Sequence, residues 1–239
     1  MRIGVPAYFS PACSPEDWAC LETLPAGSIA IVNPDSGPAP GMSVEYGDAV
    51  RAVRRHGVLV YGYIDLAYGV SGLGSVARAA AAYRRRLGVD GAFLDQAPAD
   101  AAALAPYHRL GRGLRAMGMR TAINPGRPLV DDRAGGWFDE VVTFEGHWSD
   151  YRRVPVRFDA TADAGRWHLV YGVPERETFE AMARARRHGA GVAYVTDGHM
   201  PNPWLGLPAA WRSLVGLSRA PGRAATVPGW RAPALVGEP

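Results

Sequence analysis

Short apolar runs rich in β-branched residues alternate along the chain with longer amphipathic stretches. Each run has the length and composition of a buried strand, and glycine, proline or polar residues bound most of them. The predicted strands are Ile3–Tyr8, Ser28–Asn33, Val58–Ile64, Gly91–Asp95, Arg120–Asn124, Glu140–Glu145, His168–Tyr171 and Gly191–Thr196. The pattern therefore predicts eight strands.

Helical stretches separate several of these strands, and a glycine follows each of the clearest ones. The predicted helices are Val76–Leu87, Tyr107–Met117 and Arg176–His188, followed by Gly88, Gly118 and Gly189. Glycine is favoured just beyond a helix because it adopts positive φ without steric cost. A helix, a glycine and then a short apolar strand form the recurring unit, which indicates a parallel sheet.

Eight strands favour closure into one (β/α)8 barrel, a TIM-type α/β fold, with an open doubly wound sheet as the alternative. The glycines Gly69, Gly72 and Gly74 follow the third strand, and their spacing is not that of a dinucleotide-binding loop. The predicted catalytic domain covers residues 1–217. Residues 218–239 are rich in Pro, Gly, Ala and Arg and are expected to form a C-terminal tail rather than a second domain.

Composition narrows the possible chemistry. Of 239 residues, 48% are hydrophobic, and the formal net charge is +3. All 26 basic residues are Arg, which excludes Schiff-base, pyridoxal-phosphate and P-loop chemistry because each needs a Lys amine. The arginines are spread over the predicted helices, so we expect no nucleic-acid partner. Cys13 and Cys20 have no further metal-ligand pattern beside them, and we expect neither a metal nor another cofactor.

The first predicted strand begins close to Met1, and no apolar run approaches the length of a membrane span. We therefore expect a cytoplasmic protein without a membrane partner, or a secreted one if a leader has been trimmed. The oligomeric state stays open.

Polar side chains close nearly every predicted strand. They are Tyr8, Asn33, Tyr63 with Asp65, Asp95 with Gln96, Asn124, Glu145, Tyr171, and Thr196 with Asp197. In a parallel barrel the active site forms where the strands end, so these side chains are expected to surround one mouth. Each of Asn33, Asn124 and Asp197 could equally cap a helix or stabilise a loop.

Asp95 and Glu145 stand apart because each follows a strongly apolar strand. An unpaired buried carboxylate is costly, so such a group lies at a solvated mouth or in a tuned pair. Strands four and six are next but one in the barrel, which lets the two carboxylates face each other. Two carboxylates so placed are the minimum apparatus for glycoside cleavage, and two unrelated caps or ion pairs are the alternative.

Aromatic residues near the strand ends suit stacking on sugar rings, although such a ring can equally cover the core. Tyr8, Tyr63 and Trp204 are the strongest candidates. His147, His168 and His199 show no metal-binding spacing. His147 could tune Glu145, whereas His168 opens its predicted strand and is expected near the bottom of the barrel.

The strand-end motifs, taken in order, resemble the spherulin-4 family. They are Val5-Pro6-Ala7-Tyr8-Phe9, Ile31-Val32-Asn33-Pro34 with Ser36-Gly37-Pro38, Gly62-Tyr63, Asp90-Gly91-Ala92-Phe93-Leu94-Asp95, Asn124-Pro125-Gly126, Phe144-Glu145-Gly146, His168-Leu169-Val170-Tyr171-Gly172 and Tyr194-Val195-Thr196-Asp197. The resemblance runs from residue 5 to about Trp211. It implies a (β/α)8 glycoside hydrolase acting on galactosaminogalactan at α-1,4-linked N-acetylgalactosamine.

The resemblance further implies Asp95 as nucleophile and Glu145 as acid/base of a retaining, metal-independent enzyme. The expected substrate-binding residues are Tyr8, Asn33, Tyr63, Gln96, Asn124, Tyr171, Asp197 and Trp204. One departure matters, because the family usually has Glu where this chain has Gln96, and Gln cannot ionise. Two alternatives follow: a sugar-binding barrel without hydrolysis, and a cytoplasmic tailoring enzyme for a small polyhydroxylated metabolite.

Overall fold

The chain folds into a closed barrel of eight parallel strands, each hydrogen-bonded to its neighbours in sequence order, with β8 returning to β1. The computed structural model describes residues 1–130, 136–155 and 163–219. The strands are β1 (Arg2–Ala7), β2 (Ile29–Val32), β3 (Leu59–Asp65), β4 (Gly91–Asp95), β5 (Arg120–Ile123), β6 (Glu140–His147), β7 (Asp163–Tyr171) and β8 (Ala190–Val195). The predicted (β/α)8 barrel is confirmed.

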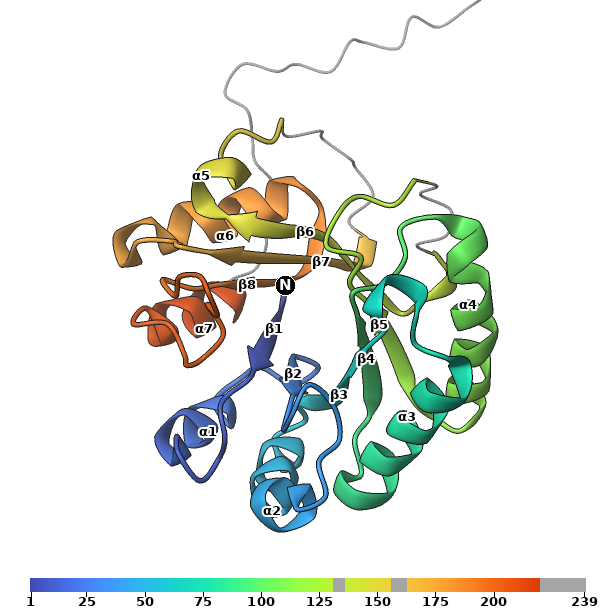
Figure 1. The fold of residues 1–239 in the computed structure, drawn as a ribbon. Coiled ribbons are helices and arrows are strands. Elements are labelled where there is room, and N and C mark those ends of the chain that lie inside the picture. The colour runs from blue at the N-terminus through green and yellow to red at the C-terminus, as the bar shows by residue number, and fades with distance from the viewer. Residues whose placement is uncertain (131–135, 156–162, 220–239) are drawn as a thin grey trace, which may run out of the picture.

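Helices surround the ring of strands on its outside (Figure 1). They are α1 (Pro15–Leu21), α2 (Met42–Arg55), α3 (Leu73–Leu87), α4 (Ala101–Ala116), α5 (Trp148–Tyr151), α6 (Thr178–Arg187) and α7 (Trp211–Arg219). Short 3-10 turns lie at Ala67–Gly69 and Glu175–Glu177. None of the helices in the described part of the chain is both long and apolar enough to cross a membrane.

The barrel interior is filled by large side chains. The indole of Trp167 on β7 is fully buried and packs edge-on against Phe93 of β4, with ring centroids 5.5 Å apart. Gly4 of β1 leaves room for it, because a Cβ at residue 4 would lie 2.1 Å from the indole. A filled interior confines any ligand to the ends of the barrel.

At the end where the strands begin, an ionic cluster holds the barrel together. Glu140, the first residue of β6, is fully buried. Its Oε1 accepts from Arg2 at 3.0 Å and from Arg120 at 2.6 Å, and its Oε2 accepts from Tyr61 at 2.9 Å. Each partner comes from a different strand. We therefore infer that the cluster stabilises the barrel and takes no part in catalysis.

Three elements differ from the sequence prediction. Strand β7 begins at Asp163, five residues before its predicted start, so His168 lies in the middle of the strand and not at its opening. Helix α4 begins at Ala101 with Pro106 inside it, because the Asp100 side chain caps the amides of Ala102 and Ala103. Strand β6 continues to His147, and its register with β7 shifts between Val142 and Phe144.

The predicted domain boundary after residue 217 stays a prediction. Helix α7 continues through Arg219. Residues 220–239, which make up most of the predicted tail, lie outside the described residues.

Candidate active site

Asp95, Asn124 and Glu145 meet at the end of the barrel where the strands finish. Asp95 is the last residue of β4, Asn124 directly follows β5, and Glu145 lies near the end of β6. The three strands are neighbours in the barrel, so parallel pairing brings these side chains to one side of the mouth. Both carboxylates are half-buried, and Asn124 is buried.

The side-chain amide of Asn124 bridges the two carboxylates. Its Nδ2 donates to Asp95 Oδ1 at 2.8 Å and to Glu145 Oε2 at 2.5 Å. Its Oδ1 accepts from the amide of Gly126 at 3.0 Å, which fixes the orientation of the group. The two acceptor oxygens are therefore at most 5.3 Å apart, the sum of the two distances to Nδ2.

This bridge uses both amide hydrogens of Asn124 within the protein. The predicted role of Asn124 in substrate binding stays a prediction, whereas its role in positioning both carboxylates follows directly from the geometry. Sequence alone could not reveal the bridge, because an Asn after a strand is equally typical of a loop cap.

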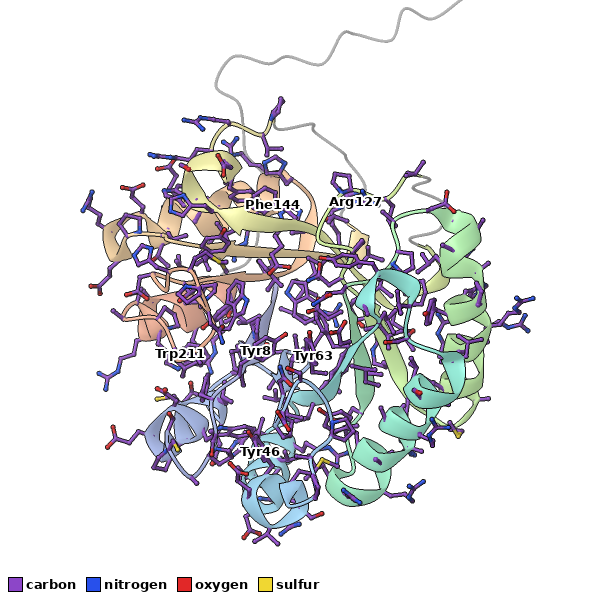
Figure 2. All side chains as sticks on the ribbon, in the orientation of Figure 1. Tyr8, Tyr46, Tyr63, Arg127, Phe144 and Trp211 are labelled. Atoms are coloured by element: carbon purple, nitrogen blue, oxygen red, sulfur yellow. The ribbon has the colours of Figure 1, made fainter. Side chains whose placement is uncertain are left out.

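Two tyrosines complete the carboxylate pair's surroundings. The Tyr63 hydroxyl, from β3, donates to Asp95 Oδ2 at 2.8 Å. Tyr8, which follows β1, packs its ring edge-on against Tyr63 with centroids 5.5 Å apart, and the two lie side by side in Figure 2. Burial raises the pKa of Tyr8 well above its usual value, and the charge of Asp95 raises it further. Tyr8 therefore stays neutral and can donate to a ligand.

Gln96 contacts Asp95 through its backbone and not through its side chain. Its φ is +49°, a left-handed conformation that is uncommon outside glycine. In this conformation its N–H donates to the Asp95 carboxylate, and its carbonyl accepts from the amide of Tyr68 at 2.7 Å. Both bonds use main-chain atoms, so they are available to Gln and Glu alike.

Burial is the largest influence on both carboxylates, and it raises the pKa of each. For Asp95, hydrogen bonds from Tyr63, the Gln96 backbone and Asn124 oppose this rise. For Glu145, the bond from Asn124 is the one contact within the described part of the chain that opposes the rise, and the charge of Asp95 raises its pKa further. The groups that donate to the pair are neutral, so the site distinguishes the two carboxylates by their number of donors.

Tyr171 and Trp204 form a second aromatic group at the mouth. The Tyr171 ring at the end of β7 lies 5.6 Å from that of His147 and 6.1 Å from that of Trp204. Trp204 is buried and also packs on Tyr194 of β8. His147 contacts Ser149 through Nδ1 and caps the start of α5. His147 lies two residues beyond Glu145 on β6, so the two side chains leave the strand on the same face.

Asn33 and Asp197 bond to their own loops. Asn33 Oδ1 accepts from the amide of Gly37 at 3.1 Å, and Asp197 Oδ2 accepts from the amide of Ala209 at 3.4 Å. These contacts match the loop-stabilising alternative noted for both residues. Their predicted binding roles stay predictions.

Asp65 was expected at the mouth as a strand-end residue but was assigned no catalytic or binding role, and it lies beside the pair. It is paired in register with Asp95, and its charge contributes to raising the pKa of Asp95. Its position at the end of β3 was the signal that could have identified it. Within residues 1–130, 136–155 and 163–219, no group of three His, Cys, Asp or Glu side chains is placed to hold a metal ion.

Comparison with solved structures identifies the same barrel in other proteins. Sph3 from Aspergillus clavatus, solved in complex with GalNAc, matches with a TM-score of 0.70 and 22% identity, over 90% of this chain and 96% of that one. A chitinase domain from Pyrococcus furiosus matches with a TM-score of 0.53 and 14% identity, over 91% and 94%. At these identities the likeness establishes the fold.

Sequence comparison establishes the family. Spherulin-4 from Physarum polycephalum is 28% identical over 212 residues, and the match spans 83% of this chain but 64% of that protein's length. The model of spherulation-specific family 4 matches residues 2–217, which is nearly all of the described chain. The resemblance inferred from the strand-end motifs is thus confirmed, and the chain belongs to spherulation-specific family 4.

Proposed function

We propose that this protein is a retaining glycoside hydrolase in which Asp95 is the nucleophile and Glu145 is the acid/base. The shared Asn124 donor carries the proposal, because it holds oxygens of the two carboxylates within 5.3 Å of each other. Retaining glycosidases place their carboxyl groups about 5–5.5 Å apart, whereas inverting enzymes need about 6.5–9.5 Å to admit a water molecule.

The hydrogen bonds support this division of roles. Three donors stabilise the ionised form of Asp95, as a nucleophile requires. Among the described residues Glu145 accepts from Asn124 alone, and burial and the charge of Asp95 both favour its protonated form. Glu145 is therefore the group that holds a proton to give to the leaving oxygen.

The proposed reaction has two steps. Asp95 attacks the anomeric carbon while Glu145 protonates the leaving oxygen, so a glycosyl–Asp95 ester forms as the glycosidic bond breaks. Glu145, now ionised, then removes a proton from water, which attacks the same carbon and releases Asp95. Water supplies the hydroxyl of the new reducing end, and both carboxylates return to their starting protonation states.

We infer a substrate containing α-1,4-linked galactosamine or N-acetylgalactosamine. Family membership and the GalNAc bound to Sph3 support this substrate class. Tyr8 beside the carboxylate pair offers a neutral hydroxyl and a ring to such a sugar.

The second candidate is a barrel that binds the same sugars without cleaving them. Gln96 favours it, since the family's usual Glu could have ionised at that position. Against it, the contacts that Gln96 makes to Asp95 and Tyr68 use main-chain atoms.

Release of reducing ends from N-acetylated and de-N-acetylated α-1,4-galactosaminoglycan tests the proposal. Wild type should cleave at least one polymer, and Asp95→Asn and Glu145→Gln should each lose about 10³-fold or more in kcat. Equal activity in wild type and both variants would refute the assignment. Binding by calorimetry without any product would establish the second candidate.

A further inference from the structure

An exposed aromatic ring lies in the loop that follows β3. This loop is next to the end of β4, where Asp95 lies. Among the described residues, Tyr68 and Phe179 are the large aromatic side chains most open to solvent, with 64% of Tyr68 exposed. Tyr68 follows β3 by three residues, and its amide donates to the carbonyl of Gln96 at 2.7 Å. Tyr68 is therefore bonded to the residue that directly follows Asp95, the proposed nucleophile.

The backbone around Tyr68 is held in an unfavourable conformation. Four non-glycine residues in the described chain have φ in the left-handed region, and three of them are Ala67, Tyr68 and Gln96, with φ of +46°, +53° and +49°. Each such residue costs conformational free energy, and the three are joined through the Tyr68–Gln96 hydrogen bond. Such clustering is typical of sites where a geometry is maintained for function.

Several contacts fix this loop. Asp65 Oδ1 accepts from the Ala67 amide at 2.6 Å, and the Ser71 hydroxyl donates to the Asp65 carbonyl at 2.9 Å. The Tyr107 hydroxyl of α4 donates to the Ser71 carbonyl at 2.6 Å. The loop thus holds the Tyr68 backbone firmly while its ring stays open to solvent.

Gly69 allows the loop to approach the neighbouring loop after β4. Its φ is +101°, and a Cβ there would lie 3.2 Å from Cγ of Pro98. The loops after β3 and β4 therefore pack together at the mouth, and a backbone hydrogen bond joins Tyr68 to Gln96.

A buried Tyr ring usually packs in the hydrophobic core and stabilises the fold. A ring as exposed as that of Tyr68 contributes little to stability. A solvent-open aromatic ring whose backbone is bonded to Gln96, next to Asp95, suits the apolar face of a pyranose. In a galacto-configured sugar the axial O4 leaves the carbons from C3 to C6 exposed on one face, which an aromatic ring can cover.

We propose that Tyr68 is a stacking platform for a sugar next to the one that is cleaved, and so selects oligomeric over monomeric galacto-configured substrates. This inference rests on the proposed function. It adds a binding subsite beside the carboxylate pair and implies that the substrate occupies the mouth with two or more sugar units.

Kinetics on two substrates test the platform: an α-1,4-linked N-acetylgalactosamine hexasaccharide and an aryl α-N-acetylgalactosaminide. Tyr68→Ala should raise KM for the hexasaccharide about tenfold, the scale of one aromatic contact, and leave the aryl glycoside within about twofold. Tyr68→Phe should behave as wild type on both, because stacking does not need the hydroxyl. Val70→Ala, at an exposed position of the same loop, is the matched control.

Two results would overturn the platform while leaving the proposed function intact. One is an equal loss of activity on both substrates in Tyr68→Ala. This result would mean that Tyr68 positions Asp95 and does not bind a neighbouring sugar. The other is an unchanged KM for the hexasaccharide. Calorimetry with the hexasaccharide in a Glu145→Gln background gives a second readout, in which adding Tyr68→Ala should weaken binding about tenfold. A Glu145→Gln protein that does not bind the hexasaccharide would refute the proposed substrate and the platform together.

Discussion

Asp95 and Glu145 accept hydrogen bonds from one and the same nitrogen, Nδ2 of Asn124, at 2.8 and 2.5 Å. A single donor that directly follows the intervening strand β5 therefore sets the separation of two carboxylates on β4 and β6. The spacing of the pair therefore depends on Asn124, which itself need not take part in proton transfer or bond formation.

Replacing Asn124 with Ala should lower kcat about 10²-fold, because both carboxylates lose a shared donor and are free to separate. KM should change far less. Steady-state kinetics measures the effect, and a melting curve separates it from a loss of stability. A kcat within about threefold of wild type would show that the bridge is dispensable.

Tyr63→Phe should move the acidic limb of the kcat/KM profile to higher pH, by on the order of one unit. The hydroxyl of Tyr63 stabilises the ionised form of Asp95, so its removal raises the pKa of Asp95, and the nucleophile becomes protonated at a higher pH. The pH dependence of kcat/KM reports this pKa in the free enzyme.

Tyr61→Phe is the matched control for that experiment. Tyr61 lies on the same strand but bonds to Glu140 at the opposite end of the barrel. Its loss should lower the melting temperature and leave the acidic limb in place. An identical pH shift in both variants would mean that Tyr63 acts through stability alone.

Gln96→Glu should change kcat less than about tenfold and raise the pKa of Asp95, since the backbone contacts remain and a second carboxylate is placed beside the first. The acidic limb should again move to higher pH. If wild type were inactive and this substitution created activity, Gln96 would be a disabling change and the sugar-binding alternative would be correct.

The free energy of unfolding should fall as pH falls from about 6.5 towards 3, in part because of His168. Burial, together with smaller contributions from the neighbouring His188 and Arg166, lowers the pKa of His168 to about 3. Between the folded value and the ordinary value near 6.5, the unfolded state binds more protons, so acid favours unfolding, by up to ~4 kcal/mol.

Denaturant titrations at pH 7 and pH 4 measure this loss. His168→Gln should reduce the difference between the two pH values, although it also removes the 2.6 Å contact with Tyr151 and lowers stability at pH 7. His199→Gln, at an exposed histidine, should leave the difference unchanged. A pH dependence unaffected by the His168 substitution would show that protonation of His168 does not cause the loss of stability.

Much of the barrel could be predicted from sequence because its strands are short, apolar and regularly spaced, and because each ends in a polar residue. The same pattern located Asp95 and Glu145. It could not show that Asn124 serves both carboxylates, because that role depends on two neighbouring strands. The left-handed conformation of Gln96 was equally hidden, since no glycine marks that position. His168 was misplaced because the polar first half of β7 lacks the apolar signal of a strand.

The anomeric configuration of the first product, followed by proton NMR during hydrolysis of an α-linked N-acetylgalactosamine oligosaccharide, tests the carboxylate pair most directly. With Asp95 Oδ1 and Glu145 Oε2 no more than 5.3 Å apart, hydrolysis should proceed with retention, so the α-anomer should appear first and mutarotate later. Initial formation of the β-anomer would contradict a nucleophilic Asp95 and the pairing proposed here.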